Sequence, residues 1–204
     1  MKDMMHMGLF LFIIAAVSGI LLAYTENLTA PLIKENQRQL LEQARREVLP
    51  EAKSFSDKIL ENETDKIPVT AGFTSTNELA GIVMNVSPKG YGGPIEMVVG
   101  ITPAGRISGV KILSQKETPG LGTKLSAPVF TEPFKKLLTE KSAPDFRVKK
   151  DGGDIDAITA ATISSRAFCS GLKDALANYE KIKAGLSSLE PLSQKAQPVS
   201  GEPK

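Results

Sequence analysis

The chain has 204 residues, of which 25 are lysine or arginine and 23 are aspartate or glutamate, spread along its length. Without a basic block, this composition gives no indication of a nucleic-acid partner. The chain has one histidine, His6, and one cysteine, Cys169, which are too few for a zinc site or an internal disulfide. His6 is also about 150 positions from the hydroxyl-rich residues 156–165, so a Ser/His/Asp triad is not expected there. Any chemistry must therefore come from a bound cofactor.

An apolar segment lies near the N-terminus. Residues 7–24 (MGLFLFIIAAVSGILLAY) carry no charge, and 18 helical residues span about 27 Å, close to the thickness of a hydrocarbon core. A cleaved signal peptide would have a shorter apolar core and a small residue in place of Leu21. The segment therefore predicts a retained single-pass membrane anchor over residues 1–25.

The segment over residues 26–76 is expected to connect the anchor to a domain. In residues 25–50, apolar side chains recur at helical spacings among charges, which favours an amphipathic helix kinked at Pro31. Residues 51–76 are polar and mixed in composition, and we expect a loop with short structure there.

The segment over residues 77–184 is predicted to form one α+β domain. Residues 78–87, 95–101 and 106–113 are rich in valine and isoleucine and are separated by the turn-forming SPKGYGGP and TPAG, so they predict a three-stranded antiparallel sheet. The following ETPGLGTK (117–124) has too much glycine and proline for regular structure.

Helices are expected to pack on this sheet. A short helix is predicted from Pro133, with Phe134, Leu137 and Leu138 facing inward, and residues 146–150 suggest a further strand before the turn DGGD. Over residues 164–183, apolar residues recur every three or four positions, which predicts the last helix. Residues 185–204, rich in proline and serine, are expected to be disordered.

The stretch DAITAATISS (156–165) raises the question of function because it brings four hydroxyls together without a catalytic partner. Thr162 is expected at the start of the last helix. In one interpretation, Thr162 or Ser164 caps that helix through its hydroxyl oxygen. In another, the helix N-terminus binds an anion such as a phosphate, and the small Ala160 and Ala161 let a bulky group approach. The two interpretations are compatible.

Asp156, Thr159, Ala161 and Thr162 fit the acceptor pattern of flavin transferases, Asp-x-x-Ser/Thr-Gly-Ala-Thr/Ser. Together with GYGGPIEMVVGI (90–101), ISGVKILSQKETPGLGTKL (107–125) and the apolar N-terminus, the chain resembles the G subunits of the Rnf ion-translocating electron-transport complexes. Their relatives are the C subunits of the sodium-pumping NADH:quinone reductases. The chain departs from the pattern at Ala160, where the family usually has glycine, and the extra methyl is expected to hinder entry into the transferase.

The resemblance implies an FMN cofactor covalently attached through a phosphoester to Thr162, with Asp156 and Thr159 recognised by the transferase. The loop of Glu117, Thr118, Pro119, Gly120, Leu121 and Gly122 is expected to form one side of the flavin pocket, and Thr123 and Lys124 to hydrogen-bond the ring or the phosphate. No catalytic residue and no metal ligand is expected.

By this resemblance, the chain is a subunit that relays electrons through FMN in a membrane-bound complex that couples electron transfer to ion translocation. Its partners would be the other subunits, a flavin transferase during maturation and membrane lipid. It would lie in the inner membrane, with the FMN domain on the periplasmic side. Two alternatives remain: the C subunit of a sodium-translocating NADH:quinone reductase, and a membrane-anchored assembly or binding module without redox function.

Overall fold

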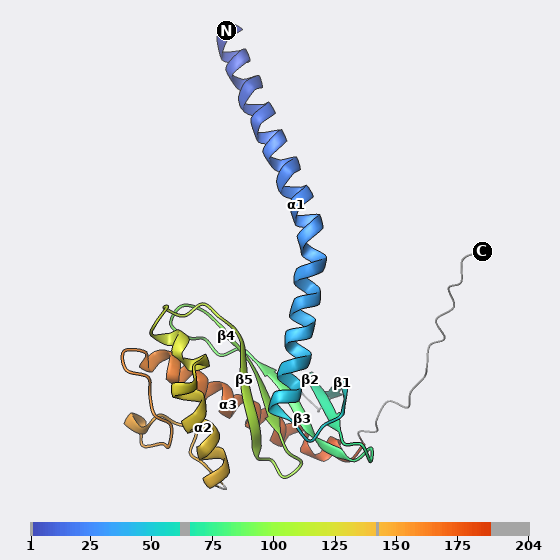
Figure 1. The fold of residues 1–204 in the computed structure, drawn as a ribbon, viewed down its shortest axis with the longest axis vertical. Helices are drawn as coiled ribbons and strands as arrows, with labels where there is room; N and C mark the ends of the chain where they lie inside the picture. Colours follow the sequence, from blue (N-terminus) through green and yellow to red (C-terminus); the bar gives the residue numbers. More distant parts are fainter. Residues whose placement is uncertain (1, 62–65, 142, 189–204) are drawn as a thin grey trace, which may run out of the picture. The chain divides into compact units, whose positions relative to one another are not determined.

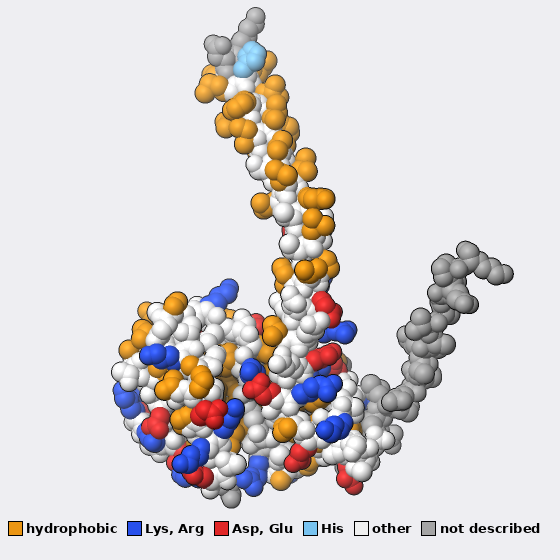
Figure 2. Space-filling view, viewed as in Figure 1, with side chains coloured by type: hydrophobic (Ala, Val, Ile, Leu, Met, Phe, Trp, Pro, Cys, Tyr) orange, Lys and Arg blue, Asp and Glu red, His pale blue; other side chains and the backbone are white. Residues whose placement is uncertain are grey.

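A computed structural model describes residues 2–61, 66–141 and 143–188. The first element is α1 (Lys2–Val48), a helix of 47 residues that continues through Pro31, where we expected a kinked second helix. Its large apolar side chains from Met4 to Tyr24 are exposed (Figure 2). Of the described residues, this helix alone is long and apolar enough to cross a membrane.

The chain divides into two compact units, one ending at Glu42 and one beginning at Gln43. The first unit holds most of α1. The second holds the last turns of α1 and every other element shown in Figure 1.

The second unit is built on one antiparallel sheet of five strands in the order β1-β2-β3-β4-β5. The strands are β1 (Ser54–Glu61), β2 (Lys66–Phe73), β3 (Leu79–Val86), β4 (Ile95–Ile101) and β5 (Ile107–Gln115). The last three confirm the predicted strands within two residues at each end. The loop expected over residues 51–76 was wrong, because this segment forms β1 and β2 of the same sheet.

The last turn of α1 lies directly on one face of the sheet. Each of the strands β2 to β5 presents a glycine there: Gly72, Gly81, Gly100 and Gly109. A Cβ added at Gly100 would come 2.4 Å from the carbonyl oxygen of Val48, which leaves no room for a side chain. The Ser108 hydroxyl donates a hydrogen bond to the same oxygen at 2.6 Å. Gly100 and Gly109 therefore let the helix backbone approach their strands closely, whereas Gly72 and Gly81 make room for the Leu49 side chain.

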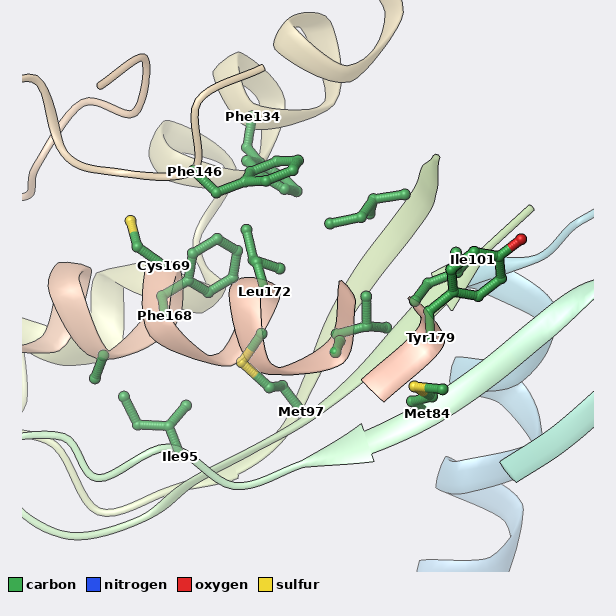
Figure 3. Close-up of a cluster of buried hydrophobic side chains, with 14 of the residues drawn as sticks. Met84, Ile95, Met97, Ile101, Phe134, Phe146, Phe168, Cys169, Leu172 and Tyr179 are labelled. Atoms are coloured by element: carbon green, nitrogen blue, oxygen red, sulfur yellow. The ribbon is translucent and has the colours of Figure 1, made fainter. Parts of the chain in front are cut away.

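Helices α2 (Pro128–Glu140) and α3 (Thr162–Ile182) enclose the main core on the other face of the sheet. Figure 3 shows Phe168, Leu172 and Tyr179 of α3 among the side chains of the strands and of α2. The ring of Phe168 meets those of Phe130 and Phe134 edge to face, with centroids 5.1 and 5.2 Å apart. The predicted α+β class, with an antiparallel sheet packed by helices, is confirmed.

Three local expectations were wrong. The segment expected to be disordered from residue 185 begins within a 3-10 helix, Lys183–Ser188, in which Leu186 is buried, and residues 189–204 lie outside the described residues. Helix α2 begins at Pro128, five residues before the predicted start, because proline at the first helical position lacks only an N–H that has no partner there. Residues 146–150 form no strand. Val148 makes a single bridge to Ile155, and Lys149–Asp151 form a short 3-10 helix that ends at Gly152, whose φ is 83°.

Candidate functional site

The candidate site begins at a tight turn just before α3. The N–H of Ala161 donates to the carbonyl of Ile158 at 2.9 Å, so Thr159 and Ala160 occupy the two central positions of the turn. Ala160 has a φ of 64°, in the left-handed region that favours glycine. This conformation gives a physical reason for the glycine that the flavin-transferase acceptor pattern has at this position.

The buried Ser165 stabilises this turn from inside α3. Its hydroxyl accepts a hydrogen bond from the N–H of Ile158 at 3.0 Å and donates one to the carbonyl of Ala161 at 3.0 Å. The turn is thereby tied to the first turn of the helix.

Thr162 is the first residue of α3, as predicted, and it is half-buried. The expected helix cap was wrong: the residue at the N-cap position is Ala161, which has no side chain to accept a hydrogen bond, and Ser164 bonds to Glu117 instead. The Thr162 hydroxyl has no hydrogen-bond partner among the residues that the structure describes. The N–H groups of the first turn are therefore available to an anion, which the helix dipole also favours.

The Glu117 carboxylate joins two loops to this helix. The side chain is 5% exposed. Its Oε1 accepts a hydrogen bond from the N–H of Gly92 at 3.0 Å, and its Oε2 accepts one from the Ser164 hydroxyl at 2.5 Å. Glu117 was expected to line the flavin pocket, whereas both of its oxygens are bonded to the chain itself.

The rest of the Gly-rich loop is a tight exposed turn. The carbonyl of Thr118 accepts from the N–H of Leu121 at 3.1 Å, and the N–H of Gly120 donates to the Thr123 hydroxyl at 3.0 Å. Gly120 has a φ of 75°. Leu121 keeps 37% of its surface exposed, whereas Gly122 is buried and starts a 3-10 helix (Gly122–Ser126).

A cavity of about 520 Å³ adjoins the acceptor turn, between the loop before the turn and α2. Three predicted site residues, Lys124, Asp156 and Thr159, line it, whereas the other predicted residues lie outside its lining. Apolar side chains supply most of the remaining wall, mainly Val129, Phe130, Pro133, Phe134, Leu137, Ile155 and Ile158.

Charged groups at this cavity are mostly paired. Lys149 contacts Asp156 at 2.8 Å, and Lys141 contacts Asp154 at 2.5 Å. The Lys141 ammonium and the N–H of Asp145 hold the pKa of Asp154 below its usual value. Lys124 has no ion pair within the described part of the chain, so its positive charge is free to meet an anionic ligand. No cluster of histidine, cysteine, aspartate and glutamate side chains suited to bind a metal ion occurs among the residues that the structure describes.

Sequence reasoning missed several residues that build the site, namely Gly92, Ser165 and the α2 residues of the cavity wall. Gly92 lies in the motif GYGG, whose density of glycine is the one local signal for a close contact. The partners of Ser164 and Ser165 lie outside their own helix, so helical spacing does not reveal them.

Comparison with known proteins identifies both parts of the chain. Residues 90–177 match the FMN-binding domain, and residues 1–48 match the RnfG N-terminal region. The fold resembles the crystal structure of the C subunit of the Na⁺-translocating NADH-quinone reductase of Parabacteroides distasonis, with a TM-score of 0.50 and 20% identity over 74% of this chain and 96% of that one.

Two relatives resemble most of the chain. The G subunit of the Na⁺-translocating ferredoxin:NAD⁺ oxidoreductase complex of Acetobacterium woodii is 34% identical, over 89% of this chain and 94% of that protein. The G subunit of the proton-translocating ferredoxin:NAD⁺ oxidoreductase complex of Clostridium ljungdahlii is 32% identical, over 83% and 88%. The chain therefore belongs to the family of G subunits of ion-translocating oxidoreductase complexes, with a single N-terminal membrane helix and an FMN-binding domain.

Proposed function

We propose that this chain relays electrons in a membrane-bound ion-translocating complex through an FMN attached covalently to Thr162. Bound FMN takes up and releases one or two electrons, and the protein supplies its position and electrostatic surroundings. The other subunits of the complex are its electron donor and acceptor, and a flavin transferase loads the cofactor.

The burial and hydrogen bonding of the four hydroxyls in DAITAATISS support Thr162 as the attachment site. Ser164 and Ser165 are buried, and their hydroxyls are engaged in hydrogen bonds. Thr159 and Thr162 have hydroxyls without a partner in the part of the chain that the structure describes. Of these two, Thr162 alone begins a helix, where the open N–H groups and the dipole favour a phosphate.

Attachment at Thr162 is a balanced group transfer. The Thr162 Oγ1 bonds to the flavin-side phosphorus of a flavin adenine dinucleotide donor, the phosphoanhydride bond breaks with AMP as the leaving group, and the hydroxyl proton goes to a base of the transferase. Residues Asp156 and Thr159, which precede the acceptor, face solvent and are accessible to that enzyme.

The cavity beside the acceptor turn has the size and chemistry to receive the flavin ring. Its volume of about 520 Å³ lies in the range of small-molecule sites. Apolar α2 side chains suit the hydrocarbon edge of the ring, and Lys124 offers a donor for its polar edge or for the phosphate. The exposed loop of Thr118, Gly120 and Leu121 precedes Lys124 in the chain, and the Thr123 hydroxyl supports this loop by accepting a hydrogen bond from the N–H of Gly120.

The attachment is tested by co-expressing the full chain with a flavin transferase and measuring the intact mass and in-gel flavin fluorescence of the denatured protein. We expect an FMN-sized adduct on the wild type and on Thr76→Ala, a matched control at an exposed threonine between β2 and β3, and none on Thr162→Ala. An adduct that persists in Thr162→Ala would place the acceptor elsewhere. A wild type that stays unmodified, beside a positive control substrate, would instead support a binding module without redox function.

We also propose that the FMN domain lies on the periplasmic side of the inner membrane. The single cysteine, Cys169, is buried, so the wild type offers little background to thiol reagents. Ser75 is exposed between β2 and β3, away from the site. A membrane-impermeant maleimide added to spheroplasts is expected to label Ser75→Cys before lysis. Labelling that requires lysis would put the domain in the cytoplasm.

A further inference from the structure

We infer that Glu117 is a positioning residue of the FMN site, a buried clamp that holds the loop over residues 88–94 and the first turn of α3 in place around Thr162. The inference rests on the proposed attachment at Thr162. It gives Glu117 a role distinct from contact with the flavin, because the carboxylate acts through the two segments that it binds.

The hydrogen bonds of Glu117 span three parts of the chain. Gly92, which bonds to Oε1 at 3.0 Å, precedes Glu117 by 25 residues, and Ser164, which bonds to Oε2 at 2.5 Å, follows it by 47. The structure describes no lysine, arginine or histidine within ion-pair distance of this carboxylate. A group that is 5% exposed and has no such partner depends on these two donors for its stabilisation.

Glycines on both loops make room for the carboxylate. A Cβ added at Gly90 would lie 2.3 Å from Oε1, and one added at Gly122 would lie 2.6 Å from Oε2 and 2.9 Å from the Ser164 hydroxyl. A Cβ at Gly92 would lie 2.0 Å from the carbonyl oxygen of Lys116. The glycines of GYGG and of GLG therefore serve the same contact, although 30 residues separate Gly92 from Gly122.

The clamp acts on the acceptor through Ser164, two positions after Thr162 in the first turn of α3. Ser165 ties the same turn to Ile158, so neighbouring serines anchor the helix start to two different segments. Helix ends fray unless such contacts hold them. Loss of the Glu117 contact would loosen the helix start and displace the Thr162 hydroxyl from the geometry that phosphoryl transfer requires.

Two substitutions separate the geometry of the clamp from its charge. Glu117→Gln retains an oxygen that accepts from Gly92 and gains an amide that donates to the Ser164 hydroxyl, whereas Glu117→Ala loses both bonds. Glu96→Ala is the matched control, because Glu96 is an exposed glutamate on β4. Ser164→Ala removes one of the two bonds and serves as a milder probe.

The experiment uses the full chain in detergent. One arm measures kcat/KM for flavin attachment by a purified transferase, and the other measures hydrogen–deuterium exchange of the chain before attachment. We expect Glu117→Ala to lower kcat/KM roughly tenfold and to speed exchange at residues 89–93 and at the start of α3, with exchange in β1 to β3 unchanged. Glu117→Gln and Glu96→Ala should match the wild type, and Ser164→Ala should lie between.

Wild-type kinetics and exchange in Glu117→Ala would overturn the inference, as would a loss in Glu117→Gln equal to that in Glu117→Ala. If exchange shows that Glu117→Ala unfolds throughout the domain, Ser164→Ala becomes the deciding variant. A Ser164→Ala protein with the kcat/KM and the exchange rates of the wild type would then overturn the clamp. If the wild type itself accepts no flavin, the proposed function fails, and the exchange arm still decides the clamp.

Discussion

The Ser165 hydroxyl accepts a hydrogen bond from the N–H of Ile158 at 3.0 Å, across the turn that precedes α3. We expect Ser165→Ala to lower the free energy of unfolding by about 1–2 kcal/mol, because the mutation leaves a partly buried N–H without its acceptor. Urea unfolding followed by circular dichroism measures this change. The control is Ser170→Ala, an exposed site on the same helix, which should change stability by less than about 0.5 kcal/mol. Equal effects of the two substitutions would contradict the role given to Ser165.

Ala160 occupies a left-handed backbone conformation, with a φ of 64°. Since this region costs a non-glycine residue roughly 1–2 kcal/mol, which the greater unfolded-state entropy of glycine partly offsets, Ala160→Gly should stabilise the domain by about 0.5–1 kcal/mol. It should also speed flavin attachment. Ala177→Gly, at an exposed position inside α3, should destabilise by about 1 kcal/mol. The opposite signs of the two alanine-to-glycine changes are the diagnostic result, and a loss of stability in both would contradict the strained turn.

The elements predicted correctly are those whose composition or periodicity reflects burial. Strands β3 and β4 are buried over five consecutive residues each, so their valine and isoleucine content identifies them, whereas helix α3 presents a regular apolar face to the core. Strand β1 was missed because it lies at the sheet edge and exposes Ser54, Asp57 and Ile59, which gives it no continuous apolar face. Strand β2 was missed because Pro68 and Gly72 interrupt its pattern, although Ile67, Val69, Ala71 and Phe73 do alternate.

Some features of the candidate site likewise follow from local sequence signals, and others do not. The position of Thr162 at the helix start follows from local signals, namely the small residues before it and the helical spacing after it. The contact between Glu117 and Ser164 does not, because it joins residues that the fold alone brings together. The positive φ of Ala160 was also not visible in the sequence, since alanine rarely adopts that conformation.

The contact of α1 with the sheet makes Gly100 sensitive to any side chain. A Cβ there would lie 2.4 Å from the carbonyl oxygen of Val48, so Gly100→Ala must displace backbone and should cost about 1–3 kcal/mol of stability. Ser108→Ala removes the hydrogen bond to the same oxygen and should cost about 1 kcal/mol. Ser114→Ala, exposed on the same strand, is the control for the second change. Denaturant unfolding that gives equal values for Ser108→Ala and Ser114→Ala would be inconsistent with this contact.

Burial raises the pKa of the Cys169 thiol from 9.0 to about 11. Because the unfolded chain ionises first, this contribution to stability is complete below pH 9 and is lost as the pH rises toward 11. Burial of Tyr179 raises the pKa of its phenol as well, so the wild type alone does not isolate the thiol. We therefore expect the stability of the wild type to fall more steeply between pH 9 and pH 11 than that of Cys169→Ala.

The same burial predicts the reactivity of the thiol. Iodoacetamide at pH 8 should modify Cys169 slowly in the native protein and rapidly in urea, since the thiolate is the attacking species. Mass spectrometry at timed intervals measures both rates. Rapid alkylation without denaturant, or parallel pH profiles for the wild type and Cys169→Ala, would mean that the start of α3 opens to solvent. Such opening would also undermine the rigid acceptor geometry inferred for Thr162, because Cys169 lies less than two turns further along the same helix.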